Sequence, residues 1–206
     1  NDTLRNIENI SGSGYDDTLI GDDGRNQING RSGDDLVDTA GDDDLLIGSN
    51  GNDIFTGGAG LDLVDFASAT AGVSVDLALG VGSGQGDDTF SGIENLSGSI
   101  FDDTFTGDDG VNLILGKSGD DIIDGAGGDD ELQANYGDDT TRGGDGNDAI
   151  YDFGGVDQVF GEAGDDLLRH RTTLLRSDPL RLRHPLHHAL VGPSRSTAPS
   201  APRSGT

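Results

Sequence analysis

The 206-residue chain contains no Cys, Met or Trp, and its aromatic residues are limited to three Tyr and seven Phe. The absence of Cys excludes a disulfide scaffold, a thiolate metal site and a cysteine nucleophile. Basic side chains are also scarce, since residues 1–168 contain five of them against 38 acidic ones, a net charge of −33. Such a surface repels phosphates, so no nucleic acid is expected to bind there. No signal peptide is recognisable, and no apolar run is long enough to span a membrane.

What the chain does contain is a strict period of nine residues. An Asp or Asn recurs at every ninth position in two series, and the residue two places later is apolar in every repeat except the one with Thr141. Few aromatic residues and 36 Gly would otherwise suggest disorder, but disordered acidic chains rarely keep a register. The period therefore predicts a solenoid. The series are Asp17, Asn26, Asp35, Asp44, Asp53 and Asp62, and then Asp103, Asn112, Asp121, Asp130, Asp139, Asp148, Asp157 and Asp166.

A longer period divides the chain into similar halves, because residues 2–13 return as residues 88–99 and the match continues without a gap. Each half is a lead-in followed by a block of nonapeptides. The predicted boundaries place a lead-in strand and the first block in residues 1–65, an interrupting β segment and second lead-in in 66–99, the second block in 100–168, and a basic tail rich in Pro, Arg and His in 169–206.

The interrupting segment loses the nine-residue register. Apolar and polar residues alternate from Val73 to Leu79, which predicts a half-buried strand. Residues 80–86 are rich in Gly and predict a turn or loop, and residues 93–96 predict a further strand. In the tail, seven Arg and all five Pro favour disorder or a shifted reading frame, with a short helix at residues 172–176.

One repeat, residues 143–151, shows what each position does. Positions 1 to 6 turn the chain, with Gly where the backbone needs a positive φ or a close approach, and positions 7 to 9 form a short strand with Ile150 pointing inward. Two repeats make one coil, so position-6 acids that are two repeats apart stack on one edge. Carboxylates about 5 Å apart repel by roughly 3 kcal/mol at an effective dielectric of about 20. The coil is therefore expected to need a counter-ion.

Calcium suits such turns, because it takes six to eight oxygen ligands in flexible geometries, whereas magnesium demands a strict octahedron. Zinc is disfavoured, because residues 1–168 contain no Cys or His. The best ligands are position-6 carboxylates whose turn has Gly at position 4, together with the carbonyls of those glycines. Two stacked turns make one site, and the pair Asp44 and Asp62 is weaker because Asp42 replaces the Gly. The candidate ligands are Asp35, Asp44, Asp53, Asp62, Asp121, Asp130, Asp139, Asp148, Asp157 and Asp166, with Gly33, Gly51, Gly119, Gly128, Gly137, Gly146, Gly155 and Gly164.

These turns resemble the RTX, or hemolysin-type, calcium-binding repeat, whose consensus is G-G-x-G-x-D-x-U-x with U apolar. Residues 143–150 fit the consensus fully, and so do residues 57–64. The resemblance implies an all-β, right-handed parallel β-roll solenoid in two nonapeptide blocks with a disordered C-terminal tail. It also implies several bound Ca²⁺ ions, type I secretion, and folding on Ca²⁺ binding outside the cell or at its surface.

The sequence shows no catalytic constellation, because all four His lie in the tail away from any acidic motif. We therefore expect a non-enzymatic, calcium-binding repeat module of a secreted or surface bacterial protein. The alternative is the C-terminal RTX portion of a secreted protease, lipase or polysaccharide-modifying enzyme with its catalytic domain upstream, since the chain begins at Asn1 in mid-pattern. Calcium ions are the expected partners, and extracellular matrix or cell-surface polysaccharide is a further candidate. The pattern leaves the oligomeric state open.

Overall fold

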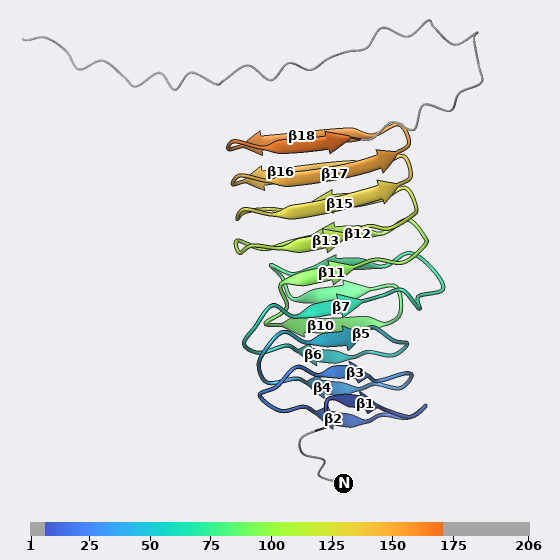
Figure 1. Cartoon of the computed structure of the whole chain (residues 1–206). Helices are drawn as coiled ribbons and strands as arrows, with labels where there is room; N and C mark the ends of the chain where they lie inside the picture. Colours follow the sequence, from blue (N-terminus) through green and yellow to red (C-terminus); the bar gives the residue numbers. More distant parts are fainter. Residues whose placement is uncertain (1–6, 171–206) are drawn as a thin grey trace, which may run out of the picture. The chain divides into compact units, whose positions relative to one another are not determined.

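A computed structural model describes residues 7–170, which form two sheets of short strands stacked along one axis (Figure 1). Successive repeats alternate between the sheets, so strands that are two repeats apart pair in parallel and in register, as Ile28 does with Leu46. Residues 7–170 contain no helix, which confirms the all-β solenoid. The first sheet contains β1 (Asn9–Ser11), β3 (Gln27–Asn29), β5 (Leu45–Ile47), β7 (Leu63–Asp65), β11 (Asn95–Ser97), β13 (Leu113–Leu115), β15 (Glu131–Tyr136), β17 (Ala149–Gly154) and β19 (Leu167–His170). The second, in spatial order, contains β18 (Gln158–Ala163), β16 (Thr140–Asp145), β14 (Ile122–Asp124), β12 (Thr104–Thr106), β8 (Ser74–Asp76), β9 (Val81–Ser83), β10 (Asp87–Ser91), β6 (Ile54–Thr56), β4 (Leu36–Asp38) and β2 (Thr18–Ile20).

The core is a single ladder of position-8 side chains between the sheets. Alternate side chains of a strand point to opposite faces, so in a three-residue strand only the middle one turns inward. The inward residue of β7, Val64, has no exposed surface, and Thr141 takes the same buried place in β16. In the regular turns the core is therefore one residue thick, and its position-8 members are Ile10, Ile28, Val37, Leu46, Phe55, Val64, Leu96, Phe105, Ile114, Ile123, Leu132 and Ile150. The interrupting segment adds Phe66, Ala69, Val73, Val75, Phe90 and Ile93 to the core.

The interrupting segment is built into the sheets rather than set between two separate solenoids. In the first sheet, β7 pairs directly with β11. In the second, β8 continues into β12, β10 continues from β6, and β9 runs antiparallel between β8 and β10. The ring of Phe90 in β10 stacks on the ring of Phe55 with 5.6 Å between the ring centroids, and it packs edge-on against Phe66 with 6.3 Å between the centroids. Both sheets therefore run continuously through the two nonapeptide blocks.

Two details of this segment differ from the sequence-based expectation. The predicted strand from Val73 is shorter, because β8 ends at Asp76 and Leu79 is 73% exposed. The prediction of a loop throughout residues 80–86 was wrong, because β9 forms there. The cause is a close contact, since a Cβ on Gly82 would lie 2.7 Å from the ring of Phe90. Glycine at this position lets a strand lie against an aromatic ring. The strand predicted in residues 93–96 is present in part, because β11 begins at Asn95 and ends at Ser97.

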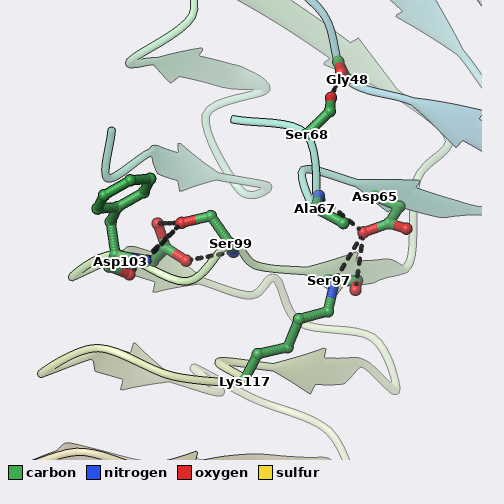
Figure 2. Close-up of polar contacts among 9 residues, drawn as sticks. Gly48, Asp65, Ala67, Ser68, Ser97, Ser99, Asp103 and Lys117 are labelled. Atoms are coloured by element: carbon green, nitrogen blue, oxygen red, sulfur yellow. Dashed lines mark hydrogen bonds and ion pairs between the residues drawn. The ribbon is translucent and has the colours of Figure 1, made fainter. Parts of the chain in front are cut away.

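A polar cluster joins the two blocks where β7 meets β11 (Figure 2). Asp65 Oδ1 accepts hydrogen bonds from Lys117 Nζ at 2.8 Å, Ser97 Oγ at 3.1 Å and the Ala67 N–H at 3.0 Å. The side chains of Lys117 and Asp65 are 33% and 30% exposed, so this ion pair is partly shielded from water. One carboxylate thus connects three turns of the solenoid. The helix and disorder expected beyond residue 170 lie outside the described residues.

Candidate metal sites

The turns place a column of glycine carbonyls along each edge of the solenoid. The position-4 glycines predicted as ligands have positive φ, from 114° at Gly128 to 147° at Gly164, a conformation open to Gly and strained for most other residues. They also stack closely, because a Cβ on Gly137 would lie 1.7 Å from the carbonyl oxygen of Gly119 in the turn below. At position 4 of its turn, Asp42 replaces Gly and adopts φ 69°, which Asp tolerates better than most side chains. The other predicted position-4 glycines, Gly33, Gly51, Gly146 and Gly155, also have positive φ.

The position-6 acids form the two columns that the two-repeat coil predicts. In each stacked pair, the backbone N–H of one residue donates to Oδ1 of the Asp one coil later. The distance is 2.8 Å from Asp121 N to Asp139 Oδ1 and 2.9 Å from Asp130 N to Asp148 Oδ1. Every ligand pair predicted from the sequence is joined in this way, namely Asp35 with Asp53, Asp44 with Asp62, Asp121 with Asp139, Asp139 with Asp157, Asp130 with Asp148, and Asp148 with Asp166.

The second oxygen of most of these carboxylates is buried without a hydrogen-bond partner. The residues are almost fully buried, at 1% exposure for Asp121 and 2% for Asp130. An unpaired buried carboxylate oxygen is unfavourable unless a cation is near. Asp166, in the last described turn, is exposed instead. The Oδ2 atoms that accept no hydrogen bond within the described part belong to Asp35, Asp44, Asp62, Asp121, Asp130, Asp139 and Asp148.

Most of these Oδ2 atoms face a space that a position-1 glycine leaves open. A Cβ on Gly125 would lie 2.4 Å from Asp130 Oδ2 and 2.4 Å from the carbonyl oxygen of Gly143. A Cβ on Gly116 would likewise lie 2.4 Å from Asp121 Oδ2. A carboxylate oxygen and a backbone carbonyl thus converge on a cradle that any side chain would fill. Hard oxygen donors in this arrangement fit Ca²⁺.

The electrostatics favour a bound cation. Burial, joined by the neighbouring carboxylates of its column, raises the pKa of Asp121 to about 7. The same causes raise the pKa values of Asp62, Asp130 and Asp139 to about 6. Burial also raises the pKa values of Asp35, Asp44, Asp53 and Asp148. A divalent ion beside these oxygens would favour their ionised form, so ion binding and carboxylate ionisation are coupled.

Several position-6 residues are satisfied within the protein and differ from this group. Asn112 Oδ1 accepts the Asp108 N–H, and its Nδ2 donates to the Glu94 carbonyl, each at 2.9 Å. Asp103 Oδ2 accepts the Ser99 N–H at 2.7 Å (Figure 2). Among the predicted ligands, Asp53 Oδ2 accepts a side-chain hydrogen bond from Ser49 Oγ at 3.1 Å. Turns without an orphaned oxygen are the weaker candidates.

Two acids of the columns were missed by the sequence analysis. Asp88 Oδ1 accepts the Asp53 N–H at 2.9 Å, and Glu94 Oε2 accepts the Asp62 N–H at 3.0 Å. They lie 35 and 32 residues after their partners, so a search at the regular two-repeat spacing passes over them. Burial raises the pKa of Asp88 to about 6, as it does in the regular turns. The segment that interrupts the repeat therefore continues both carboxylate columns.

This chain is thus a parallel β-solenoid in which buried carboxylates and backbone carbonyls meet in the turns, and that arrangement is typical of a metal-binding repeat protein. The sequence model of the RTX calcium-binding nonapeptide repeat matches residues 11–46, 38–68, 88–123, 97–132 and 133–168. These matches cover more than half of the chain, which belongs to this family and binds Ca²⁺ at several turns. A search of curated proteins found no match. Within residues 7–170, no helix is long and apolar enough to cross a membrane.

Proposed function

We propose that this chain is a module that folds when Ca²⁺ binds outside the cell, in a bacterial protein exported by type I secretion or held at the cell surface. The observation that carries this proposal is the set of buried Oδ2 atoms that accept no hydrogen bond, such as that of Asp130. Without an ion, these oxygens are shielded from water and the carboxylates repel along each column. With an ion, the same oxygens become ligands, and binding adds to the stability of the folded state.

The size of the core supports calcium-dependent folding. Each repeat buries one main apolar side chain, such as Leu132 or Ile150. A fully buried residue of this kind contributes about 1.5–3 kcal/mol, whereas ordering a residue costs roughly 1–2 kcal/mol of backbone entropy. Nine residues are ordered for each inward one. Apolar burial alone therefore does not balance the entropy, so the fold also depends on the hydrogen bonds of the two sheets and on ion binding in the turns.

Calcium supply then decides where the module folds. Extracellular calcium modules bind with dissociation constants of about 10⁻⁴–10⁻³ M, far above the free concentrations that calcium sensors respond to inside cells. Sites of this strength stay empty in the cytoplasm and fill outside. The chain would leave the cell unfolded and fold after export.

The test is a calcium titration of chelator-treated protein, with folding monitored by far-UV circular dichroism. We expect the β-sheet signal to be lost in excess EDTA and restored by Ca²⁺ but only weakly by Mg²⁺. Asp139→Asn removes a buried ligand and should shift the calcium midpoint upward. Asp145→Asn makes the same chemical change at an exposed position 3 and should titrate like the wild type. An unchanged β signal in EDTA, or equal midpoints for the two variants, would refute the proposal.

A catalytic role for the parent protein would reside in a domain outside the described residues. Residues 7–169 contain no His and no Cys, and their position-6 acids are engaged in the columns described above. We propose that any protease, lipase or polysaccharide-modifying activity precedes Asn1 in the gene. Translation of the upstream reading frame decides between these alternatives, because a catalytic motif there would assign this chain to a secreted enzyme.

A further inference from the structure

The last complete turns of the solenoid contain an acidic residue where the repeat has glycine. Position 1 of the repeats is Gly throughout, except at Thr39, Ala134 and Asp152, and only Asp152 is charged. Asp152 lies in β17 and has no exposed surface. Its side chain therefore enters the interior of the coil, at the position where most other turns leave an open cradle.

Asp152 brings a third carboxylate to a pair of stacked position-6 acids. Asp139 and Asp157 are joined by the hydrogen bond from Asp139 N to Asp157 Oδ1, at 3.1 Å. Together with Asp152, each offers one ligand oxygen, and the three oxygens lie within 4.8 Å of one another. The pairing of β15 with β17 shifts register between Gln133 and Asn135, and Asn135 is the residue paired with Asp152. The backbone of the sheet is thus irregular beside the added acid.

A buried oxygen at this cluster independently points to a ligand. Asp139 is 1% exposed, and its Oδ1 is already engaged by the Asp121 N–H at 2.8 Å. Its Oδ2 is buried and accepts no hydrogen bond, so Oδ2 is the oxygen that Asp139 can offer to an ion. Three negative charges this close in a partly desolvated space repel strongly. A divalent cation among them removes that repulsion and uses all three oxygens.

We propose that Asp139, Asp152 and Asp157 form a three-carboxylate Ca²⁺ site that binds more tightly than the two-carboxylate sites of the regular turns. Calcium affinity rises with the number of charged ligands, and a third carboxylate adds one full charge to a pair. Backbone carbonyls and water complete the six to eight ligands that the ion takes. This inference rests on the proposed calcium-dependent folding, and it assigns Asp152 a role that its position in the repeat does not imply.

The experiment is isothermal titration calorimetry of the full chain with CaCl₂ after removal of bound metal. The wild type should show a first binding step at least about tenfold tighter than the rest. Asp152→Asn keeps the size of the side chain and removes its charge, so that step should disappear while the weaker steps remain. Asp145→Asn is the matched control, since it removes one exposed carboxylate from the same block and should retain the tight step.

If the Asn variant does not fold in saturating Ca²⁺, Asp152→Gly replaces it, because Gly is the residue at position 1 of most other repeats. This variant should also lack the tight binding step. Retention of the tight step in a folded Asp152 variant would overturn the inference and leave the proposed function intact. Absence of calcium binding in the wild type would overturn the proposed function itself. Circular dichroism of each variant at saturating Ca²⁺ establishes which proteins are folded.

Discussion

Replacing Asp121 with Asn is predicted to have opposite effects in the absence and presence of calcium. Burial, with the nearby carboxylates, raises the pKa of Asp121 from 3.8 to about 7. A raised carboxyl pKa in the folded state means that ionisation opposes folding. The loss of folding free energy caused by ionisation is absent below about pH 4, grows as the pH rises, and is complete above about pH 7. Each pH unit corresponds to about 1.4 kcal/mol, so full ionisation destabilises the calcium-free fold by about 4 kcal/mol.

The Asn side chain removes that charge and has a precedent at position 6. Asn112 occupies the equivalent place with both amide groups hydrogen bonded. Asp121→Asn should therefore stabilise the calcium-free fold by about 2–4 kcal/mol at about pH 8. In calcium the variant lacks a ligand, and a site saturated at about 100 times its dissociation constant contributes about 2.7 kcal/mol. The advantage of the variant should therefore disappear or reverse when Ca²⁺ is added.

Urea denaturation in EDTA and in saturating Ca²⁺, monitored by circular dichroism, measures both values. If the calcium-free wild type is already unfolded, the variant should show more β signal than the wild type in EDTA. The control is Asp120→Asn, which neutralises the exposed neighbour of Asp121 and should change stability by no more than about 0.5 kcal/mol. A variant that is less stable than the wild type in EDTA, or equally favoured with and without Ca²⁺, contradicts this account of the columns.

The carboxylate columns, the position-4 glycines and the stacked ring of Phe90 can each be tested separately. Acidification from about pH 8 to about pH 5 in EDTA should increase the β-sheet signal, because carboxyls with pKa values of about 6 to 7 in the fold gain protons there. Calcium binding should weaken over the same pH range. A circular dichroism signal that does not change with pH would contradict this prediction. Gly137→Ala places a side chain at φ 146° and should lower the free energy of unfolding in Ca²⁺ by at least about 1–3 kcal/mol. The control is Gly154→Ala, where the nearest atom lies 3.9 Å from the added Cβ, and its free energy of unfolding should stay within about 1 kcal/mol of the wild type. Similar losses in the two variants would refute the turn geometry. Phe90→Ala removes the ring stacked on Phe55 and should lower stability in Ca²⁺ by about 3–5 kcal/mol, against less than about 1 kcal/mol for the partly exposed Phe101→Ala, as measured by urea denaturation.

The regular turns could be predicted from the sequence because their contacts repeat at a constant separation. A residue at position 6 meets its partner two repeats away, and a residue at position 8 points inward in the regular strands between the ends of the solenoid. The pairing of Asp121 with Asp139 and the burial of Ile123 follow from that period. The additional acids Asp88 and Glu94 could not be found in this way, because their separations of 35 and 32 residues depend on how the inserted strands fold.

The assignment of ligand turns also needed the tertiary structure. By spacing alone, Asp53 and Asp121 are equivalent. In the fold, Ser49 donates to Asp53 Oδ2, whereas Asp121 Oδ2 accepts no hydrogen bond. The spacing likewise shows nothing unusual in Asp152 beyond the loss of one glycine. Its proximity to Asp139 depends on the direction of the side chain inside the coil.

The sequence by itself determined the repeat unit, the inward residue of each strand and the stacking of like charges, because in a solenoid these depend only on neighbours at a constant offset. The tertiary structure decided how residues 66–99 join the two blocks into continuous sheets, which carboxylate oxygens lack a partner, and where a third carboxylate enters the column. Those features depend on strand order, local register and side-chain direction, which the period of nine leaves free.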